Sequence, residues 1–264
     1  MMKTPLNISM MLERAELFFP KKQVVSRMKG GVVRHTYKEI GERTRRLSSV
    51  LKRLGVEVGD RVGTFAWNHH RHLEAYFAIP GIGAVLHTIN IRLSAQHIAY
   101  IINHADDRVL LIDDDLLPAI EAVKDEIPNV RAFIIMTDKD ELPDTTLSPV
   151  YHYEKLLAEG DPTFPFLKDL DEYQPAGMCY TSATTGNPKG VVYTHRSTVL
   201  HAMVLGLADT QGCASATSSC RSCRCSMSTP GGCRLPPRGS VRRSLCRARR
   251  LRRKCLPSSL TPNG

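Results

Sequence analysis

Residues 178–192 read M-C-Y-T-S-A-T-T-G-N-P-K-G-V-V and are the most informative segment of this chain. Apolar residues stand at both ends of it, and residues 196–208 behind it have the pattern of a helix. Between the apolar ends lies a loop rich in backbone N–H groups, hydroxyls and one ammonium group. The residues that give it this character are Thr181, Ser182, Thr184, Thr185, Gly186 and Lys189. Such groups bind anions together, so the loop predicts a site for the phosphates of a nucleotide.

The spacing excludes one common phosphate loop. The G-x-x-x-x-G-K-[ST] loop does not fit, because Lys189 follows Gly186 by three residues and Gly190 comes next. Composition alone also allows a plain surface turn rich in Ser, Thr and Gly.

Upstream of the loop, apolar strands alternate with amphipathic helices. Thr36 and Glu39 have capping-box spacing at the start of helix 36–54, and Ser94 can cap a helix that runs to about residue 104. Further helices are expected at 70–79, 116–127 and 153–158, and strands at 61–66, 84–89, 109–112 and 130–136. This alternation predicts βαβ units around a mostly parallel sheet, which is an α/β fold.

Charge divides the chain into two regions. The 264 residues carry a net charge of +10, which taken whole suggests nucleic acid as a partner. Residues 1–212, however, contain 24 Lys and Arg against 26 Asp and Glu, a net charge of −2. Residues 213–264 contain eleven Arg, one Lys, no acidic residue and seven of the eight cysteines. We therefore expect a globular domain over 1–212 and a basic, disordered tail rich in Cys, Arg and Ser over 213–264.

The first region has the features of a cytoplasmic protein. No apolar core of a secretory signal follows Met1, and the apolar run 76–89 is interrupted by Pro80, Gly81 and Gly83. A single cysteine in 212 residues gives no disulfide framework. We expect a cytoplasmic location and no transmembrane segment.

Residues 180–191, Y-T-S-A-T-T-G-N-P-K-G-V, resemble the signature loop of the adenylate-forming (AMP-binding) superfamily of acyl-CoA synthetases and luciferases. Eleven of the twelve positions suit its pattern, Y-T-S-G-T-T-G-x-P-K-G-V. The likeness continues upstream in G-D-R-V at 59–62, G-A-V at 83–85 and L-S-A-Q-H-I-A-Y-I-I-N-H-A-D-D-R-V-L-L-I at 93–112. W-N at 67–68 and Y-F-A at 76–78 are most similar to medium- and long-chain fatty-acid–CoA ligases. The resemblance covers roughly residues 10–212.

This resemblance implies a partial N-terminal domain of the acyl-CoA synthetase/luciferase-like adenylate-forming fold. It also implies a reaction in which a fatty acid carboxylate attacks the α-phosphate of ATP, with Mg²⁺ present, and gives acyl-AMP and pyrophosphate. Coenzyme A then displaces AMP and forms the thioester. The β- and γ-phosphates would be held by Thr181, Ser182, Thr184, Thr185, Gly186 and Lys189.

Two departures from the family bear on activity. Ala183 stands where the family has Gly, and its Cβ costs roughly 1 kcal/mol or more if the loop needs a positive φ there. The family's adenine-contacting aromatic segment, ribose-binding Asp, Mg²⁺-associated Glu, hinge and catalytic Lys have no counterpart here. We therefore assign no catalytic residue and no metal ligand, and we expect this chain to be an inactive fragment of a ligase.

The tail is consistent with a frameshift near Gly212. Its Arg, Ser, Cys, Pro and Gly are typical of a GC-rich gene read out of frame. A set of synonymous codons for residues 223–233, shifted by one frame, reads P-M-F-H-V-N-A-W-G-L, which is similar to the next motif of fatty-acyl-CoA synthetases.

Other residues that could carry chemistry also have structural interpretations. His69, His70 and His72 could bind a metal, but histidines at a helix start are more often solvated caps. Asp113, Asp114 and Asp115 could bind a cation, but at a strand-to-helix junction they favour the helix dipole. Cys179 is expected to be a buried structural thiol. The spacing of His195 and His201 assigns them no role.

Two other classes of function remain open. One is a different adenylate-forming enzyme, such as an aryl-CoA ligase or the adenylation module of a peptide synthetase. The other is a basic, Cys-rich protein in which Cys220, Cys223, Cys225 and Cys233 bind zinc or residues 242–254 bind nucleic acid. The zinc spacing is irregular and the basic run lacks aromatic residues for stacking, so no specific nucleic acid is expected.

Overall fold

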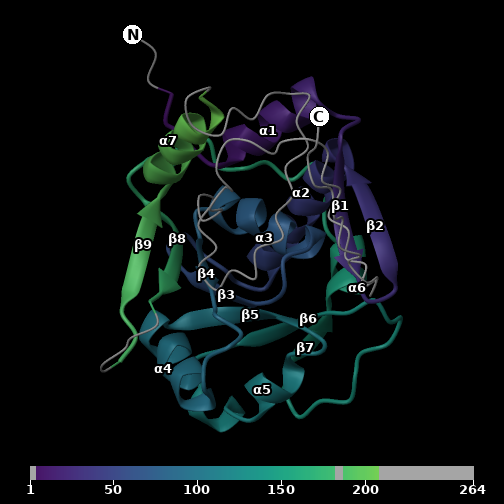
Figure 1. The fold of residues 1–264 in the computed structure, drawn as a ribbon, viewed down its shortest axis with the longest axis vertical. Helices are drawn as coiled ribbons and strands as arrows, with labels where there is room; N and C mark the ends of the chain where they lie inside the picture. The colour runs from purple at the N-terminus through teal and green to yellow at the C-terminus, as the bar shows by residue number, and fades with distance from the viewer. Residues whose placement is uncertain (1–3, 182–186, 208–264) are drawn as a thin grey trace, which may run out of the picture. The chain divides into compact units, whose positions relative to one another are not determined.

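The fold is built on one central sheet, seen in a computed structural model that describes residues 4–181 and 187–207 (Figure 1). The strands lie in the order β7-β6-β5-β3-β4-β8-β9. Neighbouring strands are parallel except β8 and β9, which are antiparallel. Their bounds are β3 Arg61–Phe65, β4 Val85–Thr88, β5 Asp107–Asp113, β6 Ala132–Met136, β7 Val150–His152, β8 Pro175–Tyr180 and β9 Gly190–Thr194. The predicted α/β fold is confirmed.

Helices pack on both faces of this sheet because its central strands are apolar on both sides. In β5, Val109 and Leu111 join the core that α2 (Tyr37–Arg53), α3 (His70–Gly81) and α6 (Tyr153–Ala158) cover. Leu110 and Ile112 of the same strand join the core under α4 (Ala95–Ala105) and α5 (Leu117–Glu121). The period-two alternation of a strand thus produces two hydrophobic layers.

The predicted helix caps are present. The Thr36 hydroxyl accepts a hydrogen bond from the backbone N–H of Glu39, and the Glu39 carboxylate accepts one from the N–H of Thr36 at 2.7 Å. Gly55 follows α2 with a φ of +81°, which ends the helix at little cost for a glycine. Ser94 caps α4 through the N–H of His97.

One predicted helix is shorter than expected. The segment 116–127 forms α5 over Leu117–Glu121 and then a separate 3₁₀ turn, η1, over Lys124–Glu126. Ile127 is not helical, with φ −120° and ψ 59°, and it precedes Pro128, whose ring disfavours the helical conformation of the residue before it.

Three elements before α2 were not expected from the sequence. They are α1 (Ser9–Phe18) and the antiparallel pair β1 (Gln23–Met28) and β2 (Gly31–Thr36). Val25 and Val32 of this pair are exposed, so the two strands show no clear alternation of apolar and polar residues. The short edge strand β7 was also missed.

The amino-terminal segment is bonded to the other end of the described chain. The backbone N–H of Leu6 donates to the Glu172 carboxylate at 2.8 Å, and that of Ile8 donates to Nδ1 of His195 at 3.3 Å. Ile8 also packs with Ala176 and with Val199 of α7 (His195–Gly206). Within residues 4–181 and 187–207, no helix is long and apolar enough to cross a membrane.

Candidate functional site

The predicted phosphate loop connects β8 to β9. The backbone N–H of Thr181 donates to the carbonyl oxygen of Lys189 at 3.0 Å, and the Thr181 hydroxyl reaches the same oxygen at 3.4 Å. The next pair of residues is Tyr180 of β8 and Gly190 of β9, which are partners in the antiparallel pairing of these strands. We call these four residues, Tyr180, Thr181, Lys189 and Gly190, the loop base. Ser182, Ala183, Thr184, Thr185 and Gly186 lie outside the described residues.

The loop base contains an exposed cation. The Lys189 side chain is exposed, and in the part of the chain that the structure describes it forms no ion pair. Thr181, whose backbone is bonded to that of Lys189, is half-buried. An exposed ammonium group can bind an anion without first breaking an internal salt bridge.

The position of the loop in the sheet suits a ligand site. Because β8 is parallel to β4, the loop starts from the carboxyl edge of the parallel sheet, where the segments after β3, β5 and β6 also begin (Figure 1). Ligands of open α/β sheets bind outside this edge.

Cys179 comes just before the loop base and is buried, as predicted. Its Sγ lies 4.0 Å from the Tyr193 hydroxyl, and burial raises the pKa of the thiol. A protonated, enclosed thiol is a poor nucleophile, so the structural interpretation is favoured.

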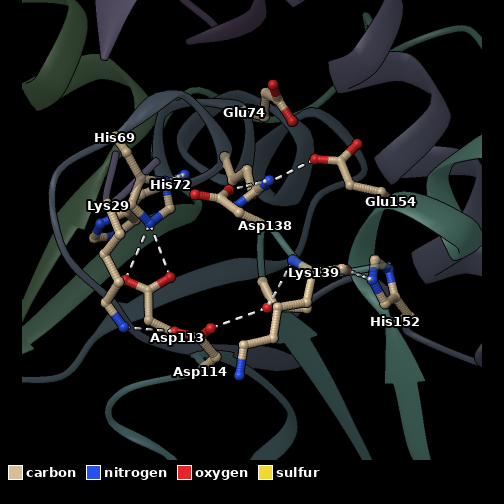
Figure 2. Close-up of polar contacts among 12 residues, drawn as sticks. Lys29, His69, His72, Glu74, Asp113, Asp114, Asp138, Lys139, His152 and Glu154 are labelled. Atoms are coloured by element: carbon tan, nitrogen blue, oxygen red, sulfur yellow. Dashed lines mark hydrogen bonds and ion pairs between the residues drawn. The ribbon is translucent and has the colours of Figure 1, made fainter. Parts of the chain in front are cut away.

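The three consecutive aspartates at the end of β5 pair with other side chains, and Figure 2 shows Asp113 and Asp114 in such contacts. Asp113, the last residue of β5, accepts from the Trp67 N–H at 2.7 Å and lies 2.9 Å from Nε2 of His69. Asp114 pairs with Lys29 of the β1–β2 turn at 3.0 Å, and Asp115 lies 3.5 Å from the same lysine. The helix α5 begins at Leu117 and has no acidic residue in its first turn, so these contacts rather than the helix dipole account for the aspartates.

The histidines at the start of α3 are also divided among different partners. His69 caps the helix through the N–H of His72, and the His72 ring lies 3.1 Å from the Thr64 hydroxyl. His70 and His72 are buried, so they are not the solvated caps that the sequence suggested. Burial lowers the pKa of His70 to about 3 and that of His72 to about 4, so both rings are neutral. Among the residues described, no group of three His, Cys, Asp or Glu could hold a metal ion.

A network of paired charges near β7, with the fully buried Glu74 among its members, was not predicted from the sequence (Figure 2). Its members join α2, α3, α6 and the segment after β6, and we call them the paired cluster: Arg43, Arg71, Glu74, Asp138, Tyr153 and Glu154. Arg43 lies 2.6 Å from Glu74, a fully buried carboxylate that also accepts from the Tyr153 hydroxyl. One signal was available, since Glu74 stands among the apolar residues of a helix.

The charges of the paired cluster neutralise one another. Burial opposes ionisation of Glu154, yet hydrogen bonds from Arg43 and Arg71 lower its pKa to about 2. Arg71 also pairs with Asp138 at 2.9 Å. A cleft of about 370 Å³ lies between this cluster and the β1–β2 turn, but its buried guanidinium is already held by two carboxylates.

The remaining candidates have no role in a site. His195 is buried and accepts the hydrogen bond from Ile8, and burial lowers its pKa to about 4. His201 is exposed on α7. The possible zinc residues, the basic run 242–254 and the rest of the region 213–264 lie outside the described residues.

A family model described as "AMP-binding enzyme" matches residues 12–224. The chain is 51% identical over 211 residues to a long-chain-fatty-acid–CoA ligase of Thermus thermophilus, covering 79% of this chain and 37% of that protein. It is 43% identical over 211 residues to a medium-chain-fatty-acid–CoA ligase of Ectopseudomonas oleovorans, covering 80% and 38%. The chain therefore spans less than two fifths of the length of these two relatives.

Solved structures share the fold. The anthranilate CoA ligase AuaEII in complex with anthranoyl-AMP aligns with a TM-score of 0.71 at 22% identity, over 78% of this chain and 38% of that one. A fatty acyl CoA synthetase of Mycobacterium tuberculosis aligns with a TM-score of 0.62 at 26% identity, over 73% and 35%. The first of these likenesses concerns the fold alone.

Proposed function

Because this chain belongs to the AMP-binding enzyme family, we propose that its residues 1–212 are the amino-terminal part of an ATP-dependent fatty acid–CoA ligase. The identity of 51% to a long-chain and 43% to a medium-chain fatty-acid–CoA ligase supports this substrate class. No observation in the described residues favours an aryl-CoA ligase, a peptide-synthetase module or a zinc-binding protein.

One observation carries the proposal. The loop base holds Thr181 and Lys189 together at the carboxyl edge of the sheet, with the Lys189 ammonium exposed and without a counter-ion in the described chain. In the proposed reaction the fatty acid carboxylate attacks the α-phosphate of ATP and expels pyrophosphate. The cation and hydroxyls of the loop lower the energy of the charge that develops on the departing phosphates.

The proposed site residues are those of the loop: Thr181, Ser182, Thr184, Thr185, Gly186 and Lys189. After pyrophosphate leaves, the thiol of coenzyme A attacks the acyl carbon of acyl-AMP, loses its proton and releases AMP. Mg²⁺ belongs to this proposal as an ion bound with ATP. We assign none of residues 4–181 and 187–207 to it, because they contain no cluster of three metal-binding side chains.

We further propose that residues 213–264 come from a shifted reading frame, and that the chain is inactive because this stretch replaces the family's own sequence after residue 212. Closure around the substrate needs the hinge and the small carboxyl-terminal domain of the family, which exclude water from the reaction.

The test is ATP–pyrophosphate exchange with octanoate and palmitate. We expect no exchange with the present chain and exchange after the frame has been restored near codon 212. Lys189→Ala in the restored protein should reduce exchange strongly, whereas Lys21→Ala, which changes an exposed lysine elsewhere, should not. Exchange with aryl or amino acids but not with fatty acids would reject the substrate class. A gene whose codons 205–235 support only the present frame would reject the frameshift.

A further inference from the structure

Tyr180, the last residue of β8, is the buried side chain of the loop base. Only 5% of its surface is exposed, and its neighbour in the chain is Thr181, which closes the loop. The Tyr180 ring therefore connects the hydrophobic layer under α4 directly to the start of the phosphate loop.

The Tyr180 hydroxyl has one specific partner. It lies 2.7 Å from Nδ1 of His104, near the end of α4, and the two rings meet edge to face with their centroids 5.7 Å apart. Burial is the main cause that raises the pKa of Tyr180 to about 12, with a smaller contribution from Asp107. The phenol is therefore uncharged at neutral pH, and its hydrogen bond fixes the ring in one orientation.

A second histidine lies against the Tyr180 ring. The rings of His87 and Tyr180 have centroids 5.2 Å apart, and His87 Nδ1 is 2.7 Å from the carboxylate of Asp107. Both members of this pair are fully buried, although β3 lies between their strands. Gly63 of β3 makes this possible, because a Cβ at that position would lie 3.0 Å from Oδ2 of Asp107.

The Tyr180 ring also lies close to β9. A Cβ built on Gly190 would lie 3.3 Å from Cζ of Tyr180, so the ring occupies the space beside the strand that returns from the loop. Tyr180 precedes Thr181 in the chain and pairs with Gly190 in the sheet, so a change in its packing is transmitted to the bond between Thr181 and Lys189 that closes the loop.

We propose that Tyr180 and His104 are positioning residues of the phosphate loop. The buried His87–Asp107 pair packs against the Tyr180 ring and holds it in contact with His104. This proposal deepens the proposed function and rests on it, since the loop is taken to bind the phosphates of ATP. Neither residue is assigned contact with the nucleotide. They hold the backbone hydrogen bond between Thr181 and Lys189, which closes the loop at its base.

The first test uses the present chain and needs no ligand. Amide exchange of Thr181, followed by NMR, reports opening of its bond to Lys189. We expect Tyr180→Phe and His104→Ala each to speed this exchange about five- to tenfold, as loss of one hydrogen bond implies. The amides of Leu110 and Leu111 in the sheet centre should be unaffected.

Two further variants separate positioning from general destabilisation. His104→Asn keeps an acceptor near the position of Nδ1 and should restore slow exchange. Tyr100→Phe removes the hydroxyl of a ring that stacks on His104 at 5.4 Å but makes no hydrogen bond within the described residues, and it should change nothing. Thr181 exchange within twofold of wild type in both Tyr180→Phe and His104→Ala would overturn the proposal.

Pyrophosphate binding, measured by calorimetry, separates this proposal from the proposed function. We expect Tyr180→Phe to weaken binding about fivefold and Lys189→Ala to weaken it more. If the wild-type chain binds no pyrophosphate, or if Lys189→Ala binds it as well as wild type, the proposed phosphate-binding function of the loop is wrong. The amide exchange of Thr181 then still shows whether Tyr180 and His104 position the loop base. If Lys189→Ala weakens binding and Tyr180→Phe does not, the positioning fails alone.

Discussion

The paired cluster and the loop base place cations near the same edge of the sheet, but in opposite environments. Arg43 and Arg71 each contact two carboxylates and share Glu154, and Glu74, the other partner of Arg43, is fully buried. Lys189 is exposed and has no ion pair in the chain that the structure describes. The difference separates cations that stabilise the fold from cations that can bind a ligand. A cation that is already paired with carboxylates binds a further anion only weakly.

The largest expected effect comes from breaking the paired cluster. Arg43→Ala leaves the fully buried carboxylate of Glu74 without its arginine and removes one of the two arginines that bind Glu154, and loss of one member of a buried ion pair costs about 3–5 kcal/mol. Urea unfolding should show this loss. Arg27→Ala, at an exposed arginine of β1, serves as the control, and a loss below about 1 kcal/mol for Arg43→Ala would mean that the cluster is not structural.

The second largest effect on the free energy of unfolding is expected from low pH, through His70 on the same side of the molecule. The pKa of buried His70 is lowered to about 3, so the unfolded chain takes up the proton first as the pH falls. His70 thus favours folding above pH 6.5, and this contribution is lost at up to about 1.4 kcal/mol per pH unit between pH 6.5 and about 3.

Glu154 adds to the loss at lower pH. Its pKa of about 2 lies below the usual value, so its contribution is present above about pH 4.5 and disappears towards pH 2. The free energy of unfolding should be measured from pH 7 to 3. His70→Leu should flatten the upper part of the curve, and exposed His201→Asn should not. An unchanged curve in His70→Leu would contradict the prediction.

Lys29 tests an intermediate case. It pairs with Asp114 and Asp115, but its side chain is 65% exposed, so Lys29→Ala should cost less than about 1 kcal/mol. This cost should shrink in 1 M NaCl, because salt screens exposed pairs. A loss as large as that of Arg43→Ala, or one that salt does not reduce, would mean that the β1–β2 turn holds the sheet edge more firmly than its exposure implies.

The smallest effect on stability is expected at Lys189. Lys189→Ala should change the free energy of unfolding by less than about 0.5 kcal/mol, because no partner in the described chain is lost. The same variant should bind pyrophosphate more weakly than wild type. A variant that is markedly destabilised would place Lys189 with the paired cluster and end the contrast between the two regions.

Sequence signals at helix starts correctly predicted the helices that depend on neighbouring residues. The capping box of Thr36 and Glu39 and the cap at Ser94 lie within four residues of the helices they start, and both helices were placed correctly. The run 116–127 misled because its apolar spacing continues while Pro128 limits the backbone before it. The β1–β2 pair was missed because its exposed valines give strands no alternation to detect.

The site was predictable only where one segment contains it. The order of residues 178–192 predicts that Thr181 and Lys189 lie near a phosphate, and the structure places these two residues in hydrogen-bond contact. The paired cluster joins residues from Arg43 to Glu154, and the Tyr180 contacts come from α4 and β4, so no window of sequence shows either. Residues that are adjacent in sequence also need not form one site. The side chains at 113–115 contact Trp67, Lys29 and His69 instead of binding one ion together.

The hydrogen bonds of Leu6 and Ile8 to Glu172 and His195 have a consequence for synthesis on the ribosome. These contacts span more than 160 residues, so the segment around Leu6 and Ile8 is synthesised long before its partners. Contacts of such long range form late and slow the completion of folding. Until α7 emerges from the ribosome, Ile8 has neither Val199 to pack against nor His195 to bind, and this segment is exposed to chaperones and proteases.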